Sequence, residues 1–153
     1  MIKTTLRNLA VSHRRQQGVT LMELMVVVAI LAIVATIAVP TYRKYLIRTQ
    51  RSEAKIALLQ LQTAQEKFYM QNNSFTDVIA DASPTGLGLP TTTETGKYVI
   101  DVEVSDDGQT YEATASPATG GGQADDTDCL NFTINQRGTR GVSGPGGTQK
   151  CWR

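Results

Sequence analysis

The chain has 153 residues, enough for one modest domain and an N-terminal segment. Its formal net charge of +1 argues against a strongly basic nucleic-acid-binding protein. Residues 1–18 hold four of the 15 basic residues and none of the 14 acidic ones, so the rest of the chain has 11 basic and 14 acidic residues and a net charge of −3.

The first element is an apolar run of 21 residues from Val19 to Val39. A helix of that length rises about 32 Å, enough to cross the hydrocarbon core of a bilayer. Aliphatic residues occupy every face, which is typical of a membrane helix and rare for a core helix in a small domain. A secretory signal would be cleaved after its apolar stretch at small residues. Residues 40–43 show no such pattern, so we expect the run to remain in the mature protein.

Residues 41–72 also have a helical pattern, but an amphipathic one. Pro40 removes one backbone hydrogen bond and would kink a continuous helix. Because no cluster of Gly, Asn or Ser separates the two stretches, we expect one long, bent helix from Val19 to about Asn72, about 80 Å in length. One face carries Ala54, Leu58, Leu61, Ala64 and Phe68, whereas Arg51, Lys55, Gln62 and Lys67 lie on other faces.

Three strands are predicted after a loop at residues 73–96 that is rich in Asn, Ser, Pro and Gly. They cover residues 97–105, 110–116 and 129–138, and the tail that follows is rich in glycine. Their alternating apolar positions are Tyr98, Ile100, Val102 and Val104, then Tyr111, Ala113 and Ala115, then Leu130, Phe132 and Ile134. A three-stranded sheet with one apolar face needs a partner, and the 54–68 helical stripe provides it. The predicted fold class is therefore α+β.

The only two cysteines, Cys129 and Cys151, lie near the C-terminus. Their position beyond a membrane segment suggests an oxidising compartment and one disulfide, which would close the C-terminal region into a loop. Two unpaired thiols are the alternative. No CxxC spacing is present and the single histidine is His13, so a zinc site is not expected.

Candidate sites for chemistry are few, and we expect neither enzymatic activity nor a cofactor or metal. No histidine follows His13, which excludes a Ser-His-Asp triad from the mature region, and no nucleotide-binding glycine pattern occurs. The acidic residues Asp125, Asp126 and Asp128 lack the spacing of a calcium loop and predict a solvated turn. The basic residues Arg137, Arg140, Lys150 and Arg153, with Trp152, predict a solvated rim, with DNA or anionic surfaces as the alternative ligand.

The stretch "QGVTLMELMVVVAILAIVATIAVP" resembles the class III signal and N-terminal helix of bacterial type IV pilins. That pattern is a basic leader ending in Gly, then usually Phe, then T-L-x-E-L and an apolar run ending at Pro. Six positions fall in register: Gly18, Thr20, Leu21, Glu23, Leu24 and Pro40. The stretches "RSEAKIALLQLQTAQEKFYMQNNSFT" and "ATGGGQADDTDCLNFTINQRG…KCW" resemble PilE-like minor pilins, so the similarity covers most of the chain.

The resemblance implies the type IV pilin fold, a long helix packed on a small antiparallel sheet with a disulfide-closed C-terminal region. It implies cleavage by a prepilin peptidase between Gly18 and Val19, with N-methylation of Val19, although the family usually has Phe at that position. It also implies that Glu23 pairs with the freed amino terminus of a neighbouring subunit and so fixes the register of assembly. A carboxylate among packed apolar helices needs such a cation.

The expected organisation is a leader at 1–18, a membrane and filament-core helix at 19–40, an amphipathic helix at 41–72, a loop at 73–96 and a sheet with the disulfide-bounded region at 97–153. The resemblance implies a subunit that waits in the inner membrane with its C-terminal domain in the periplasm and is then extruded into a pilus that serves motility, adhesion or DNA uptake. The expected partners are membrane lipid, the assembly platform and other major and minor pilins. The alternatives are a major pilin, a type II secretion pseudopilin, or a DNA- or surface-binding module on a pilin scaffold.

Overall fold

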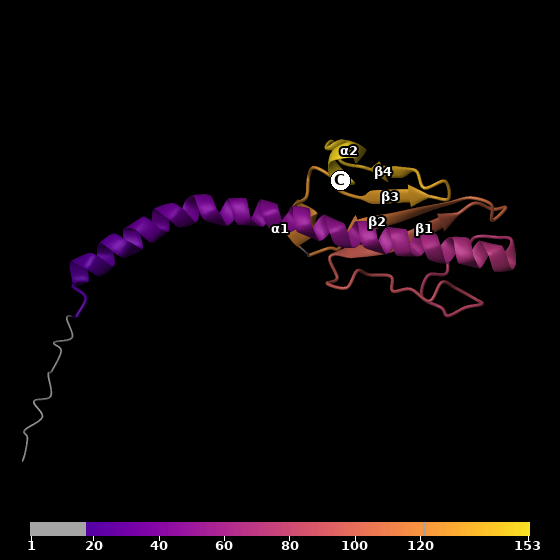
Figure 1. Cartoon of the computed structure of the whole chain (residues 1–153), viewed down its shortest axis with the longest axis horizontal. Coiled ribbons are helices and arrows are strands. Elements are labelled where there is room, and N and C mark those ends of the chain that lie inside the picture. The colour runs from indigo at the N-terminus through magenta and orange to yellow at the C-terminus, as the bar shows by residue number, and fades with distance from the viewer. Residues whose placement is uncertain (1–17, 121) are drawn as a thin grey trace, which may run out of the picture. The chain divides into compact units, whose positions relative to one another are not determined.

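The computed structural model describes residues 18–120 and 122–153 (Figure 1). The chain falls into two compact units, one that ends at Pro40 and one that runs from Thr41 to Arg153. The helices are α1 (Leu21–Asn72) and α2 (Gly147–Cys151), with a 3-10 turn η1 (Gly122–Asp125); the strands are β1 (Tyr98–Val104), β2 (Tyr111–Pro117), β3 (Phe132–Asn135) and β4 (Arg140–Val142).

Helix α1 runs without interruption for 52 residues and includes Pro40. The continuity predicted from sequence is therefore confirmed. Within the first unit every described residue is exposed, and an 18-residue window of α1 has a mean hydropathy of 2.7 with none of it buried. By length and composition α1 is apolar enough to cross a membrane.

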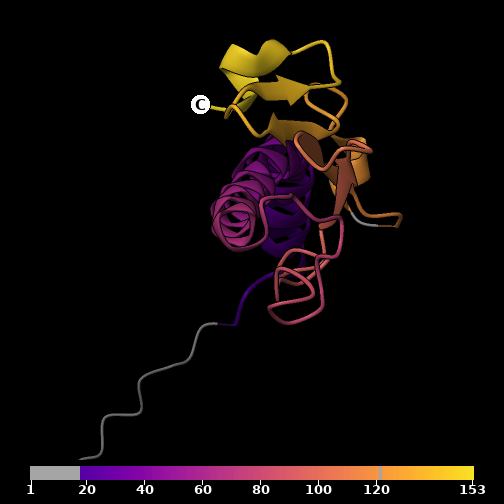
Figure 2. The same cartoon turned by 90° about the vertical axis from the view of Figure 1, so that its right-hand side faces the viewer.

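In the second unit, four antiparallel strands form one sheet in the order β1-β2-β3-β4. The part of α1 that belongs to this unit lies along one face of the sheet. Figure 2 looks along the helix and shows β4 and α2 on one flank of it and the loop of residues 73–96 on the other. The α+β class and the helix-on-sheet packing are those predicted.

The core lies between helix and sheet, where each element contributes its apolar face. Ala54, Leu58 and Leu61 of α1 are at most 1% exposed, which confirms the first part of the predicted stripe. Strand β1 alternates buried and exposed positions, as its sequence predicts. The buried core residues outside α1 are Ile79, Tyr98, Ile100, Val102, Tyr111, Ala113, Ala115, Cys129, Phe132, Ile134 and Cys151.

The loop of residues 73–96 is held on the helix by a buried glutamine. The side-chain amide of Gln65 is fully buried; its Nε2 donates to the carbonyl of Thr76 and its Oε1 accepts from the Thr76 N–H. The apolar pattern placed Ala64 on the buried stripe, but the buried position is Gln65. The two-way bond satisfies a polar side chain that would otherwise be costly to bury.

Two further details differ from the sequence-based expectation. Leu130 does not share the buried face of Phe132 and Ile134, because it has a positive φ of 52° and lies before β3 begins. The glycine-rich tail contributes a fourth strand, β4, whose Gly141 pairs with Thr133. A side chain at Gly141 would collide with the Thr133 hydroxyl, so glycine permits this close pairing.

Candidate assembly surface

The described chain begins with three exposed, non-helical residues, Gly18, Val19 and Thr20. Thr20 caps α1, because the N–H of Glu23 donates to Thr20 Oγ1 at 3.2 Å and the N–H of Leu24 donates to the Thr20 carbonyl at 3.1 Å. The bond to the Thr20 hydroxyl satisfies one of the N–H groups that any helix leaves unpaired at its start, and the bond to the Thr20 carbonyl is the first hydrogen bond of the helix itself.

Thr20 and Glu23 have the T-x-x-E spacing of a capping box. Glu23 also stands in the first turn, where a carboxylate interacts favourably with the helix dipole. This local role was missed in the sequence analysis, although the spacing alone predicts it. Glu23 therefore favours the start of the helix independently of any role between subunits.

The exposed apolar surface of α1 covers the whole circumference of residues 21–39. Large side chains such as Leu21, Met22 and Ile37 are 70–76% exposed. Surfaces of this kind are covered by lipid or by other protein. The hydroxyl of Thr36 is satisfied locally, because it donates to the carbonyl of Ile33 at 2.7 Å.

Pro40 closes this surface and has no N–H to donate to the carbonyl four residues earlier. Its position inside the helix agrees with the sequence pattern. No contact in this single chain assigns Pro40, or Gly18 and Val19, a role in assembly or processing.

At the other end of the chain, Cys129 and Cys151 form the predicted disulfide, and both are buried. The aromatic ring of Trp152 packs edge-on against Phe132, and its indole N–H donates to the carbonyl of Gly141 at 2.9 Å. The guanidinium group of Arg140 lies over the Trp152 ring, with its central carbon 5.0 Å from the ring centroid, which is a cation–π contact.

A buried ion pair ties this region to α1. Arg51 donates from Nε and Nη2 to the two carboxylate oxygens of Asp126, each at 2.7 Å. Both side chains are nearly inaccessible, at 7% and 1% exposure. The hydrogen bonds to Asp126 raise the pKa of the Arg51 guanidinium despite its burial.

The Asp126 carboxylate also accepts from Gln123 Nε2 and from the backbone N–H groups of Asp128 and Cys129, at 3.2–3.3 Å. The prediction of a solvated turn is therefore wrong for Asp126, and Arg51 is buried although the helical pattern placed it away from the apolar stripe. Each of the two charged side chains can be buried because it is paired with the other, although the two residues are 75 positions apart in the sequence. Within residues 18–120 and 122–153, no cluster of His, Cys, Asp and Glu is arranged to hold a metal ion.

The fold divides the four basic residues that sequence analysis grouped among three places. Arg137 lies at the β3–β4 turn, near Glu103 and Glu112, and Arg140 stacks on Trp152. Lys150 donates to Asp128 Oδ2 at 2.8 Å and lowers the pKa of that carboxyl.

Lys150 and Arg153 line a cleft of about 560 Å³ together with three basic residues of α1. We call it the cationic cleft. Lys55 Nζ donates to the Arg153 carbonyl at 2.6 Å and so connects the two sides. The lining residues are Arg48, Arg51, Lys55, Gly146, Gln149, Lys150, Cys151 and Arg153.

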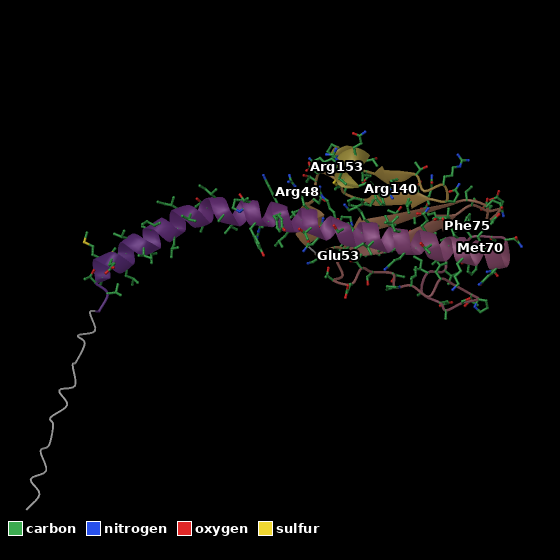
Figure 3. All side chains as sticks on the ribbon, in the orientation of Figure 1. Arg48, Glu53, Met70, Phe75, Arg140 and Arg153 are labelled. Atoms are coloured by element: carbon green, nitrogen blue, oxygen red, sulfur yellow. A yellow bond between two sulfur atoms is a disulfide. The ribbon has the colours of Figure 1, made fainter. Side chains whose placement is uncertain are left out.

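On the other flank of α1 lies a second cleft of about 470 Å³, which we call the acidic cleft. Figure 3 shows Glu53 on the side of α1 away from Arg48 and Arg153. The Glu53 carboxylate accepts from the Thr95 hydroxyl at 2.7 Å. The lining residues are Glu53, Ile56, Ala57, Gln60, Leu61, Leu89, Pro90, Thr92, Thr93, Glu94 and Ile100.

Two family models match the chain. Residues 13–39 match the prokaryotic N-terminal methylation motif, and residues 40–133 match a family described as type IV minor pilin ComP, DNA uptake sequence receptor. A solved type IV pilin from Shewanella oneidensis aligns with a TM-score of 0.45 at 18% identity, over 61% of this chain and 89% of that one.

Relatives with curated descriptions are pilins as well. The type IV major pilin PilA of Myxococcus xanthus is 46% identical over 41% of this chain and 29% of its own length, and PilE1 of Neisseria gonorrhoeae is 36% identical over 58% and 52%. The chain thus spans well under two thirds of these two relatives. A fimbrial protein of Pseudomonas aeruginosa is 35% identical over 72% of this chain and 74% of its own. With a family model over residues 40–133, more than half of the chain, these matches show that the chain belongs to the type IV pilin family.

Proposed function

We propose that this chain is a minor type IV pilin, a structural subunit that is processed, held in the inner membrane and then assembled through its N-terminal helix. One observation carries the proposal: residues 21–40 of α1 are apolar on all sides and exposed in the single chain, and the helix begins after a capping threonine, Thr20, two residues beyond the glycine of the methylation motif. A subunit of this kind supplies packing surface and performs no chemistry of its own. The match to a minor pilin family supports the minor class, whereas major pilins among the relatives keep the major class as the alternative.

We propose that prepilin peptidase cuts between Gly18 and Val19 and that the new amino terminus of Val19 is methylated. The exposed, non-helical backbone at these residues supports this, because a peptidase needs an extended and accessible segment. After cleavage the leader with its four positive charges is gone, and residues 19–40 anchor the mature chain with its second unit in the periplasm. Assembly then moves the subunit out of the membrane into the extracellular pilus.

In the filament, Glu23 is proposed to pair with the amino terminus of a neighbouring subunit. An apolar helix that leaves lipid for a bundle of apolar helices gains little hydrophobic free energy, since lipid tails are as apolar as leucine. Direction and register must come from specific polar contacts, and Glu23 is the only acidic residue within the apolar stretch. Pro40 marks the end of the segment that packs in the core.

A pair of Glu23 variants separates the register role from the cap. Glu23→Gln keeps the side chain a capping box accepts at this position but removes the charge, whereas Glu23→Ala removes both. We expect both variants to accumulate in the membrane and both to be depleted from sheared filaments. Normal incorporation of Glu23→Gln would contradict the register role and leave only the capping role.

Quantitative mass spectrometry of sheared filaments tests the remaining points together. We expect mature chains that begin at Val19, with a methyl group on its nitrogen, at a small fraction of the major subunit. A chain as abundant as any other pilin would identify the major class instead. A chain that retains residues 1–18, or that never enters filaments, would refute the proposal.

DNA binding is the second candidate, and it is favoured by the description of the matched family as a DNA uptake sequence receptor. The stack of Arg140 on Trp152 presents a cation and an aromatic ring together, which suits a nucleic acid. Arg137→Ala with Arg140→Ala should lower DNA binding and uptake with normal piliation. Unchanged DNA uptake and unchanged salt dependence of DNA binding would remove this candidate.

A further inference from the structure

The two clefts of the second unit lie on opposite flanks of α1. At about 100° per residue, Arg48, Arg51 and Lys55 fall within about 60° of one another around the helix. Glu53, Ala57 and Gln60 lie about 140–160° from Lys55. The flanking elements agree, because the cationic cleft is shared with α2 and the acidic cleft with the loop of residues 73–96 (Figure 2).

The clefts are opposite in charge. Five cationic side chains and no acidic side chain line the cationic cleft, and two acidic side chains, Glu53 and Glu94, and no cationic one line the acidic cleft. Asp126 and Asp128 pair with Arg51 and Lys150, whereas no ion pair with an acidic side chain is found for Arg48, Lys55 or Arg153 among the described residues. Burial and the neighbouring Arg51 lower the pKa of Lys55, as expected where cations crowd without enough counter-ions.

The clefts are also complementary in their apolar surface. Ile56 is 55% exposed in the acidic cleft, beside Leu89 and Pro90. The hydrocarbon stems of lysine and arginine cover such apolar surface while their charged ends reach a polar partner. A cationic flank laid on the acidic cleft can therefore bury the exposed isoleucine and pair with the two carboxylates at its rim.

We propose that the cationic cleft of one copy of this chain docks on the acidic cleft of a second copy in the filament. The contact is heterologous, since it joins two different surfaces and leaves one of each free for the next copy. The helix residues of the two clefts are centred about six positions apart, which is about 9 Å along α1. Repeating the contact therefore advances each copy along the fibre axis instead of closing a flat ring.

This inference rests on the proposed pilin function but not on the minor class, since it requires only that copies be neighbours in some part of the fibre. A nucleic acid is the competing occupant of the cationic cleft. The net charge of −3 outside residues 1–18, and the prior pairing of Arg51 and Lys150, favour a protein surface of opposite sign over a polyanion.

The test uses full-length chains in sheared filaments and a zero-length carbodiimide, which joins lysines to carboxylates in direct contact. We expect cross-linked homodimers that link Glu53 or Glu94 of one copy to Lys55 or Lys150 of another, and the yield is measured on the links from Glu53, because Glu94→Arg removes the other reactive carboxylate. Arg48→Glu and Glu94→Arg, two exposed positions for which the structure gives no side-chain hydrogen bond, should each lower the dimer yield about two- to fivefold, the range of exposed charge pairs. The double variant restores opposite charges across the contact and should recover most of the yield.

A charge exchange outside both clefts provides the control for these variants. Lys67→Glu with Glu103→Lys makes the same exchange at exposed positions outside both clefts and should leave the yield unchanged. A double variant no better than its parents, or cross-links only to other pilins, would overturn the inference while leaving the pilin function intact. Loss of DNA uptake in Arg48→Glu with unchanged dimers would make the cleft a nucleic-acid site. Absence of the wild-type chain from filaments would overturn both proposals.

Discussion

Asp126→Asn is the substitution that most directly tests how the C-terminal region is held on α1. The change is nearly isosteric, yet it replaces a carboxylate that accepts five hydrogen bonds, two of them from Arg51 at 2.7 Å. An amide has one acceptor oxygen, so its NH2 group must face donors on one side. It also leaves the buried Arg51 guanidinium without its counter-ion.

Breaking a buried ion pair by removing one partner costs about 3–5 kcal/mol. That is a large part of the 5–15 kcal/mol that stabilises a typical domain. With a urea m-value of about 2 kcal/mol/M, a loss of 3 kcal/mol lowers the unfolding midpoint by about 1.5 M. The full-length chain in detergent micelles provides its own probe, since Trp152 is the only tryptophan and packs on Phe132 in this region.

Two further variants serve as controls: one alters an exposed carboxylate, and the other removes the cation that Asp126→Asn leaves unpaired. Asp128→Asn alters a carboxylate that is 47% exposed, and its midpoint should stay close to that of the wild type. Arg51→Met added to Asp126→Asn removes the stranded cation and should recover part of the loss. A midpoint for Asp126→Asn within experimental error of the wild type would refute the reasoning, because it would mean that the buried charges do not depend on each other.

Three other predictions concern separate parts of the chain. Cys129→Ser should destabilise the second unit by about 3 kcal/mol on the chain-entropy account, read as a lower urea midpoint and faster proteolysis; unchanged protease resistance would contradict this. Thr20→Ala should cost about 1 kcal/mol at the start of α1 and speed amide exchange at Glu23 about fivefold, and equal exchange rates would argue against the cap. Burial, and then the charge of Glu66, raise the pKa of Tyr111 to about 12, so the wild type should lose stability as pH rises from 10 towards 12, and Tyr111→Phe should lose less. Parallel pH profiles for the two proteins would refute that assignment.

The parts of the fold that are encoded by local periodicity could be predicted from the sequence. The change from an all-round apolar run to an apolar stripe within α1, and the alternation in Tyr98–Val104, each depend on neighbours only a few residues away. The T-x-x-E spacing of Thr20 and Glu23 is just as local, so the cap at the start of α1 can be predicted from four consecutive residues.

The parts that could not be predicted depend on partners distant in sequence. Arg51 is a charged residue on the otherwise apolar buried face of α1. Its burial depends on the ion pair with Asp126, which lies 75 positions later in the sequence. Strand β4 has three residues with a glycine at its centre and exists through its pairing with β3. The cationic cleft collects residues from α1 and from the C-terminal end, so no window of the sequence contains it.

The buried pair and the cationic cleft are parts of one arrangement. Arg51 and Asp126 fix the turn that carries Cys129, the disulfide fixes Cys151, and the last residues are thereby held against α1 beside Arg48 and Lys55. The charge of the cleft therefore depends on a contact that is itself hidden from any partner. If this is correct, Asp126→Asn should weaken copy-to-copy cross-linking even under conditions in which the variant remains folded, because Lys150 and Arg153 lose their fixed place on the helix. A folded Asp126→Asn chain that cross-links as well as the wild type would show that the cleft assembles without its buried support.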